Sequence, residues 1–414
     1  MLSSLGFPAV GPHRRFVVAI AVDALGSGVF LPVSILYFLA TTPLSLTRIG
    51  LALSVSAALQ LPLGPLVGGL VDRVGPKRVL LAANVLEAIG FIGYVFAGSF
   101  TSVLVAAAVV QLGQTAFWGS FSPVVAMIAA PGERERWFGF LGALRNASFA
   151  VGGIAASLAI TIGTTTAYTA VVLLNATSYV LAFALILGVP RAHRPHAAAG
   201  EVGEPSGWSQ VLHDRAYLLL VVTNYTYATS AMALNIVIPV YVTQSLGLPG
   251  WVAGAIFTLN TVMIGLGQGL VVTLMEGSVR ANIVALGCLL SAASYVVLLS
   301  ADWASVGVGI GIVLVGAAVY TGGELFAGPV LSALSTDAAP LHLRGRYVSL
   351  YQMSWTVSMT IAPVTLTWLL ERGAAALWAA LTVVALAGAA LSGLLRRLLA
   401  QAGTTVPDTR VVAR

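Results

Sequence analysis

The stretch GGLVDRVGPKRVLL, residues 68–81, gathers four charged side chains in a chain that is 58% hydrophobic and only 8% charged. Gly75 and Pro76, in the middle of the stretch, are residues typical of a tight turn. Long apolar runs adjoin the stretch on both sides. It therefore predicts two apolar helices joined by a short charged connection.

The composition places these helices in a lipid bilayer. Ordinary globular chains carry about 25% charged residues, so a soluble chain of 414 residues with 8% would expose large apolar surfaces. Segments such as residues 374–395 are long enough to cross a membrane, which takes roughly 20 mostly apolar residues. No polar stretch is long enough for a separate soluble domain. We therefore expect an all-α membrane protein.

Apolar runs separated by Gly, Pro and charged turns predict twelve spanning helices. The single cysteine, Cys288, lies inside one of these runs and cannot form a disulfide within the chain. The expected helices cover residues 15–39, 47–70, 79–98, 102–129, 138–162, 166–189, 216–243, 251–275, 281–300, 303–334, 347–370 and 374–395.

Basic residues concentrate in alternate connections between these helices. Because basic connections stay in the cytoplasm, an even number of spans places both termini there. The net charge of +6 is then a signal of topology, and nucleic acid is not an expected partner. Abundant Ala and Gly and a preference for Arg over Lys point to the cell membrane of a bacterium. The residues on the cytoplasmic side are Arg14, Arg15, Arg73, Lys77, Arg78, Arg134, Arg136, Arg191, Arg194, Arg215, Arg280, Arg344, Arg346, Arg396, Arg397, Arg410 and Arg414.

The two halves of the chain resemble each other, as repeats in transporters do. A shift of 204 residues carries Gly50 onto Gly254 and Asp72 onto Glu276, and a shift of 210 carries RERWF at 134 onto RGRYV at 344. We therefore predict a duplicated architecture. Its parts are an N-terminal six-helix bundle over residues 1–189, a cytoplasmic linker over 190–215, a C-terminal six-helix bundle over 216–396 and a cytoplasmic tail over 397–414.

At the opening stretch the sequence resembles the major facilitator superfamily, whose signature between the second and third spans reads Gly-x-Leu-x-Asp-Arg-x-Gly-x-Lys. Pro76 stands where the family usually has Arg, and the matching residues are Gly68, Leu70, Asp72, Arg73, Gly75 and Lys77. Residues 322–355 resemble the twelve-helix drug:proton antiporter branch of the family. The matching residues there are Glu324, Pro329, Arg344, Gly345, Arg346 and Tyr347. The resemblance implies two pseudo-symmetric six-helix bundles that rock around a central pocket.

The resemblance also implies a cytoplasmic gate. Asp72 would lie beside the N-terminus of the eleventh span, where the helix dipole favours an anion by about 0.3–1 kcal/mol. That contact would tie the two bundles together while the cytoplasmic side is shut. The alternative is that the charges only anchor the turn at the membrane surface. The candidate gate residues are Gly68, Asp72, Arg73, Gly75, Lys77, Arg78, Glu276, Arg344 and Arg346.

Four ionisable side chains fall inside predicted spans: Asp23, Glu87, Arg145 and Glu324. Each costs a few kcal/mol at the centre of a helix, so each should face protein or water. Asp23, Glu87 and Arg145 have a similar predicted depth of roughly 12–13 Å and could meet. We expect Asp23 to exchange a proton under the control of Arg145, with a permanent structural ion pair as the alternative. Glu87 lies on a peripheral helix of this fold and is closer to a structural role.

Glu324 lies near the middle of the tenth predicted span, where a carboxyl suits proton coupling or the binding of a cationic substrate. A repeat shift of 206 residues pairs Glu324 with Trp118. In the family's fold, spans 1, 4, 7 and 10 line the cavity, which here would be aromatic with a few amides and would suit amphiphilic molecules. The candidate cavity residues are Gln114, Trp118, Asn224, Tyr227, Asn235, Asn260, Tyr320, Tyr351 and Trp355.

We therefore expect a secondary active transporter that works by alternating access and exports small amphiphilic or cationic compounds in exchange for protons. One alternative is a proton-coupled transporter of a polar metabolite or sugar, and one of another class is a membrane receptor or regulator on a transporter scaffold. Ser148 and Phe149 replace the Gly-Pro of the exporter motif in the fifth span, a departure from the family pattern.

The expected partners are a small-molecule substrate, protons and the lipid bilayer, and the chain is expected to be a monomer. We expect no enzyme activity, cofactor or metal site. The glycines of GVGIGIVLVG, which begins at residue 307, follow no predicted strand, and the His residues lack the spacing of metal ligands.

Overall fold

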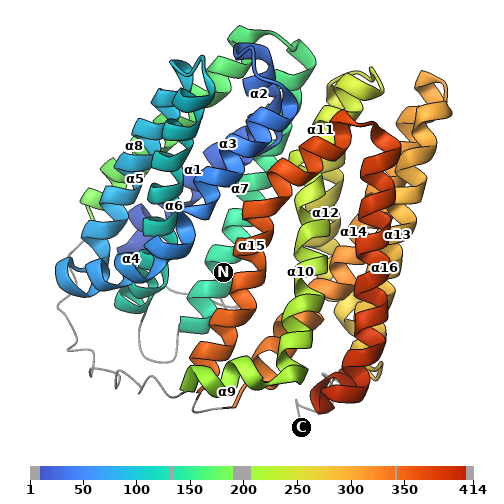
Figure 1. Cartoon of the computed structure of the whole chain (residues 1–414). Helices are drawn as coiled ribbons and strands as arrows, with labels where there is room; N and C mark the ends of the chain where they lie inside the picture. The colour runs from blue at the N-terminus through green and yellow to red at the C-terminus, as the bar shows by residue number, and fades with distance from the viewer. Residues whose placement is uncertain (1–9, 130–133, 190–206, 341–342, 407–414) are drawn as a thin grey trace. The chain divides into compact units, whose positions relative to one another are not determined.

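The structure is a computed structural model that describes residues 10–129, 134–189, 207–340 and 343–406 (Figure 1). The described residues are mostly helical, and their only β-pairing consists of two isolated bridges. Contacts divide the chain into two compact units, residues 1–198 and 199–414.

The first unit contains the helices of the first half of the chain. Pro32 cannot donate a backbone hydrogen bond, so the first span changes at that point into a short 3-10 turn before it continues. The helices are α1 (Arg14–Phe30), the turn η3 (Leu31–Val33), α2 (Ser34–Thr41), α3 (Leu46–Ala58), α4 (Gln60–Val74), α5 (Pro76–Val95), α6 (Phe100–Ile128), α7 (Arg134–Ile162) and α8 (Thr165–Leu187).

The predicted second span, 47–70, is divided into α3 and α4 at Leu59. Pro62 gives the physical reason, because it has no N–H to donate to the carbonyl of Ala58 and so interrupts the helical hydrogen-bond ladder. The span also extends further than predicted, to Val74. A segment that is one apolar run in the sequence therefore forms two helices, α3 and α4, end to end.

The second unit begins at residue 199, inside the predicted linker. Its first described helix, α9 (Gly207–His213), also lies in that segment. Pro239 interrupts the seventh span, which continues through the π-turn η4. The elements are α10 (Arg215–Ile236), α11 (Ile238–Val240), η4 (Tyr241–Ser245), α12 (Trp251–Met275), α13 (Arg280–Ser300), η5 (Ala301–Trp303), α14 (Val306–Asp337), α15 (Arg344–Glu371), α16 (Ala374–Leu398) and η7 (Ala400–Gly403).

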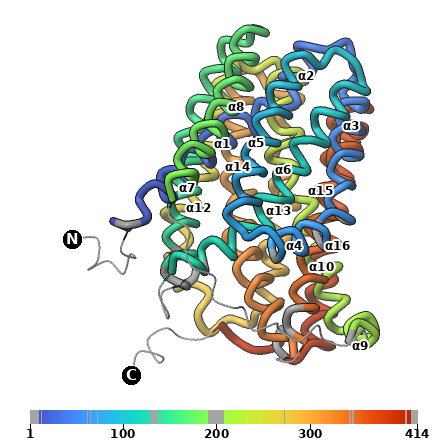
Figure 2. The backbone as a smooth tube through the Cα atoms, turned by 90° about the vertical axis from the view of Figure 1, so that its left-hand side faces the viewer, coloured from blue at the N-terminus to red at the C-terminus, as the bar shows by residue number. Residues whose placement is uncertain are grey.

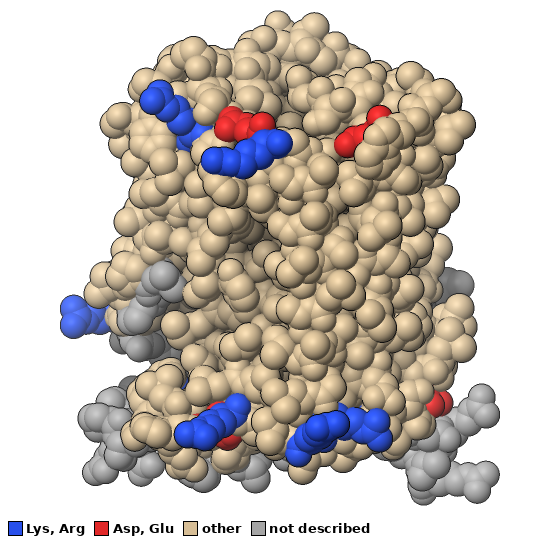
Figure 3. Space-filling view, turned by 45° about the vertical axis from the view of Figure 1, so that its right-hand side comes forward, with Lys and Arg blue, Asp and Glu red and all other residues tan. Residues whose placement is uncertain are grey.

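Within the described residues, eleven helical stretches are long and apolar enough to cross a membrane. The apolar α3, together with α4, fills the place of the remaining predicted span. Figure 3 shows that Lys, Arg, Asp and Glu on the visible face gather towards its two ends, with a broad uncharged surface between them. The prediction of an all-α membrane protein with twelve spans is confirmed.

The two units share one packing pattern, which can be followed in Figures 1 and 2. In the first unit α5 packs on α6 and α8, and α1 packs on α7 and α8. In the second unit α13 packs on α14 and α16, and α10 packs on α15 and α16. These five helices of each unit thus have counterparts with equivalent neighbours in the other unit, as duplicated transporter halves do.

Close backbone approaches give the register of this repeat. A Cβ atom on Gly113 would lie 3.0 Å from the carbonyl oxygen of Ala83, and one on Gly323 would lie 2.7 Å from that of Gly287. The two contacts occupy equivalent places in the two units. Ala83 of α5 therefore corresponds to Gly287 of α13, a shift of 204 residues, and Gly113 of α6 corresponds to Gly323 of α14, a shift of 210.

This register changes one pairing expected from the sequence. At a shift of 210 residues the counterpart of Glu324 is Gln114, whereas the sequence pattern at a shift of 206 pairs Glu324 with Trp118. The carboxyl of the second unit therefore corresponds to an amide in the first.

Candidate functional site

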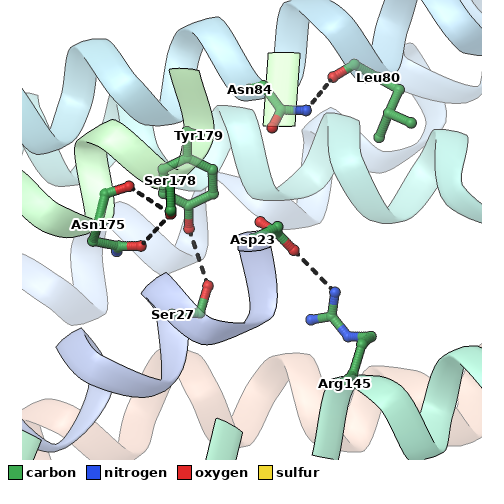
Figure 4. A network of polar contacts seen from close by, with 8 residues as sticks. All are labelled: Asp23, Ser27, Leu80, Asn84, Arg145, Asn175, Ser178 and Tyr179. Atoms are coloured by element: carbon green, nitrogen blue, oxygen red, sulfur yellow. Dashed lines mark hydrogen bonds and ion pairs between the residues drawn. The ribbon is translucent and has the colours of Figure 1, made fainter. Parts of the chain in front are cut away.

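The first candidate site is an ion pair between α1 and α7. Arg145 Nη1 lies 3.0 Å from Asp23 Oδ2, and the two side chains are 16% and 6% exposed (Figure 4). A hydrogen-bonded pair of opposite charges offsets much of the cost of placing each charge in a membrane. The structure thus brings together two of the ionisable residues that the sequence places at a similar depth.

Two glycines allow α1 and α7 to approach closely enough for this pair. A Cβ atom on Gly152 would lie 2.6 Å from the carbonyl oxygen of Leu25, and one on Gly28 would lie 2.7 Å from Phe149 Cα. Close packing of spanning helices through small residues is typical of membrane proteins.

Arg145 also lies against aromatic rings of α6. Its Cζ atom is 4.8 Å from the ring centroid of Trp118 and 5.4 Å from that of Phe117. Such cation–π contacts stabilise a guanidinium by about 0.5–2 kcal/mol, more when water is excluded. Arg145 therefore links α7 to both α1 and α6.

Further polar contacts join α1 to α8 beside Asp23 (Figure 4). The hydroxyls of Ser27 and Tyr179 are 3.2 Å apart, and Ser178 donates to the backbone carbonyl of Asn175 at 2.8 Å. On α5, Asn84 donates to the carbonyl of Leu80 at 2.8 Å. The region around Asp23 is therefore polar although it lies within apolar helices.

Glu87 on α5 is buried, with 3% of its surface exposed. Its Oε2 atom has no hydrogen-bond partner among the described residues. Phe91, one turn after Glu87 on α5, lies with its ring centroid 5.5 Å from that of Tyr179, whose hydroxyl is 3.2 Å from that of Ser27, one turn after Asp23. Glu87 therefore belongs to the same region as Asp23. The sequence alone suggests a mainly structural role for Glu87. It does not reveal that one carboxyl oxygen lacks a hydrogen-bond partner among the described residues.

The second candidate site lies around Glu324 on α14. Asn260 of α12 donates to Glu324 Oε2 at 2.6 Å and to Thr321 Oγ1 at 3.1 Å. Tyr320 donates to Glu324 Oε1 at 3.0 Å. Among the described residues no Lys or Arg forms an ion pair with this carboxyl. Two neutral donors therefore hold a partly buried acid that has no cation beside it.

Aromatic side chains lie near this carboxyl. The rings of Tyr227 and Trp355 meet edge to face with centroids 5.9 Å apart. The Tyr227 hydroxyl lies against Gly328 of α14, where an added Cβ would be 2.7 Å away. Gly328 is one turn after Glu324 on α14, so the carboxyl and the aromatic rings lie in one region of the second unit.

The other candidate cavity residues are distributed differently. Asn224 of α10 is fully buried, donating to Ser354 Oγ at 2.6 Å and accepting from the Tyr351 hydroxyl at 2.8 Å. These bonds join α10 to α15, so Asn224 and Tyr351 serve helix packing in this structure. Gln114 on α6 and Asn235 on α10 are partly buried.

The signature turn has a clear local role. Gly75 adopts a φ of +89°, which favours glycine, and Lys77 follows it in the first turn of α5. Lys77 Nζ donates to the carbonyl of Leu187 at 3.0 Å and also to that of Val189, while Arg15 donates to Gly188 at 3.2 Å. Cations at a helix C-terminus are stabilising, so Lys77 and Arg15 cap α8.

The remaining gate residues are less constrained by the structure. Gly68, Arg73 and Arg78 are exposed, and Arg346 is partly buried in the first turn of α15. Glu276 is the C-cap of α12. The side chains of Asp72 and Arg344 lie outside the described part of the molecule. A gate that joins the two bundles therefore remains a prediction.

The C-terminal segment makes a contact that the sequence does not reveal. Val406 donates to the carbonyl of Ser278 at 3.0 Å and accepts from the Gly277 N–H at 3.1 Å. The N–H of Arg280 donates to Thr404 at 3.0 Å. The first part of the predicted tail is thus paired with the turn between α12 and α13.

Comparisons with known proteins agree with this architecture. The chain matches the Major Facilitator Superfamily over residues 16–363. It is 26% identical to the multidrug resistance protein MdtH of Aeromonas hydrophila over 239 residues, 58% of each chain, and 27% identical to MdtH of Edwardsiella ictaluri over 202 residues, 49% of each chain. The matched region thus spans about half the length of these curated relatives.

Solved structures show the same fold at low identity. A crystal structure of the nucleoside transporter NupG is 10% identical, with a TM-score of 0.74 over 94% of this chain and 100% of that one. A bacterial homologue of the iron transporter ferroportin is 14% identical, with a TM-score of 0.74 over 96% and 100%. Taken with the family match over most of the sequence, these findings show that the chain belongs to the major facilitator superfamily and is a multi-pass membrane protein.

Proposed function

We propose that this protein is a transporter that works by alternating access and exports small cationic or amphiphilic compounds in exchange for protons. The observation that carries the proposal is the surroundings of Glu324, which is bonded by Asn260 and Tyr320 but by no Lys or Arg among the described residues. An ionised carboxyl inside a membrane needs a counter-charge. A proton and a substrate cation are alternative ways to supply it.

The two charged regions support different roles. Asp23 already has Arg145 as its counter-charge, whereas Glu324 has no ion pair within the described part of the chain, so a substrate cation is expected at Glu324. The rings of Tyr227 and Trp355 add aromatic surface near that carboxyl. Aromatic faces attract organic cations by about 0.5–2 kcal/mol. This combination favours amphiphilic cations over sugars or other neutral polar metabolites.

The similarity to MdtH multidrug resistance proteins supports the same substrate class. The proposal includes a monomeric chain in the bacterial cell membrane with both termini in the cytoplasm, as the distribution of basic residues favours. The substrate is exported without chemical change, because the proton gradient, and not a reaction of the substrate, drives its transport.

The test is transport by purified protein in liposomes with an imposed pH gradient, using the cationic dye ethidium as the probe. Wild-type protein should move the dye against the proton flux, and Glu324→Gln should abolish this movement. Asp302→Asn is the matched control, because Asp302 is an exposed acid of the second unit and asparagine can still accept from Tyr241 as Asp302 does at 2.8 Å. Gradient-driven transport by Glu324→Gln at the wild-type rate would contradict the proposal, and a receptor would show no such transport at all.

A further inference from the structure

Two buried acids of the first unit, Asp23 and Glu87, have only one ion pair between them among the described residues. Their exposed fractions are 4% and 3%. Arg145 forms its ion pair with Asp23. If both acids were ionised, Glu87 would be a buried negative charge without a cation bonded to it, which is strongly unfavourable.

The hydrogen-bonding groups around Glu87 indicate the same charge state. Glu87 Oε2 and Asn84 Oδ1 are buried acceptors without a donor among the described residues. Asn84 precedes Glu87 by three residues, so the two lie on one face of α5. An ionised carboxyl only accepts, whereas a protonated one offers an O–H. A proton on Glu87 supplies an O–H donor on the face of α5 where these two acceptors lie.

The packing leaves Glu87 inside the unit. A Cβ atom on Gly113 of α6 would lie 2.6 Å from Glu87 Cγ, so α6 leaves room for this side chain. Tyr179 of α8 links the two acids, because its ring packs on Phe91, one turn after Glu87, and its hydroxyl is 3.2 Å from that of Ser27, one turn after Asp23. Arg145 of α7 is bonded to Asp23. The surrounding charged and titratable groups therefore include one cation, one acid and a tyrosine.

We propose that Asp23 and Glu87 share one proton and one cation, Arg145. In the observed arrangement Arg145 pairs with ionised Asp23 while Glu87 carries the proton. In the alternative arrangement the Glu87 O–H bond breaks, the proton is bound by the Asp23 carboxylate, and Arg145 pairs with ionised Glu87. The net charge of the three side chains is zero in both arrangements. Glu87 is then the proton store of the first unit, whose use in transport rests on the proposed function.

The protonation state is tested directly by infrared spectroscopy of the full chain in nanodiscs, with ¹³C-labelled glutamate. The Glu324→Gln variant provides the background, because it removes the other glutamate that falls inside a predicted span. Its spectrum at neutral pH should retain the carbonyl band of a protonated glutamate, and Glu87→Gln in that background should lose it. An absence of any protonated glutamate band in Glu324→Gln would overturn the proposal, and this reading does not need Glu87→Gln to fold.

The thermal stability of variants provides a second test of the protonation state of Glu87. Glu87→Gln replaces a protonated acid with a neutral side chain of the same shape, so its thermal midpoint should remain close to that of the wild type. A fall as large as that of Asp23→Asn would show that Glu87 is ionised and paired, against the proposal. Neither measurement involves transport, so dye transport can fail while the shared proton is still demonstrated.

Discussion

Arg145 Nη1 donates to Asp23 Oδ2 at 3.0 Å, five residues before the point on α1 where Gly28 meets the backbone of α7. The ion pair and the glycine contact thus lie on the same helix interface. Because the helices cannot approach without the glycines, the local sequence fixes the distance at which the charges meet. The pair is therefore a structural tie between α1 and α7.

The first prediction concerns the ion pair itself. Asp23→Asn removes the partner that Arg145 has in this structure and should destabilise the protein by at most about 3–5 kcal/mol, the range for a broken buried pair, because ionised Glu87 can replace Asp23 in part. Thermal unfolding in nanodiscs measures this effect. Asp23→Asn combined with Arg145→Gln should recover part of the loss, and a double variant as unstable as the sum of the singles would argue against direct coupling.

The second prediction concerns the glycine contact. Gly152→Ala adds a methyl group within 2.6 Å of the Leu25 carbonyl oxygen and should cost about 1–3 kcal/mol by overpacking. Gly142→Ala, on the same helix, has open space around the added atom and is the matched control. The control should be neutral or slightly stabilising, since alanine favours helix by about 0.5–1 kcal/mol. Equal midpoints for the two variants would refute the close approach of α1 and α7.

The third prediction concerns Lys77 of the signature turn. Lys77→Met removes the cation from the C-terminus of α8 and should cost about 0.3–1 kcal/mol. Hydrogen exchange should increase in the last turn of α8 more than in the rest of the unit. Arg78→Met, at an exposed neighbouring position, should change neither quantity. If both variants behave alike, the turn serves only as a membrane-surface anchor.

The fourth prediction concerns Asn260. Asn260→Leu removes a donor to Glu324 and should weaken binding of a cationic dye, because a hydrogen bond to a charged group contributes about 1.5–3 kcal/mol, or roughly tenfold to a hundredfold in affinity. Gln268→Leu on the same helix is the control, since Gln268 bonds the carbonyl of Leu325 instead. Dye titration of the purified variants measures both, and unchanged affinity in Asn260→Leu would count against a cation at Glu324.

Hydrophobic periodicity and charge patterning were sufficient to predict the twelve spans, because a spanning helix must be long and apolar whatever its neighbours. They could not predict where a span is interrupted. The break at Leu59 and the π-turn after Pro239 depend on which backbone hydrogen bonds form around a proline that has no N–H to donate. The helix Gly207–His213 lies in a polar segment that reads as a linker.

For the candidate sites, helix depth was enough to bring Asp23 and Arg145 into one group, and the structure gives their distance. Depth does not give the direction of a side chain around its helix. Asn224 therefore reads from sequence as a cavity residue, although its amide bonds Ser354 and Tyr351 between two helices. Lys77 reads as a gate or anchor charge, and only the fold places it at the C-terminus of α8.

The central claim is that a proton and a substrate cation exchange at Glu324, and proton release on dye binding tests it most directly. Ethidium would be added to purified protein in weakly buffered detergent solution while pH is recorded. The wild-type protein should release a proton when it binds the dye, and Glu324→Gln at saturating dye should release none. Saturable binding to the wild type with no release of protons at neutral pH would contradict the claim.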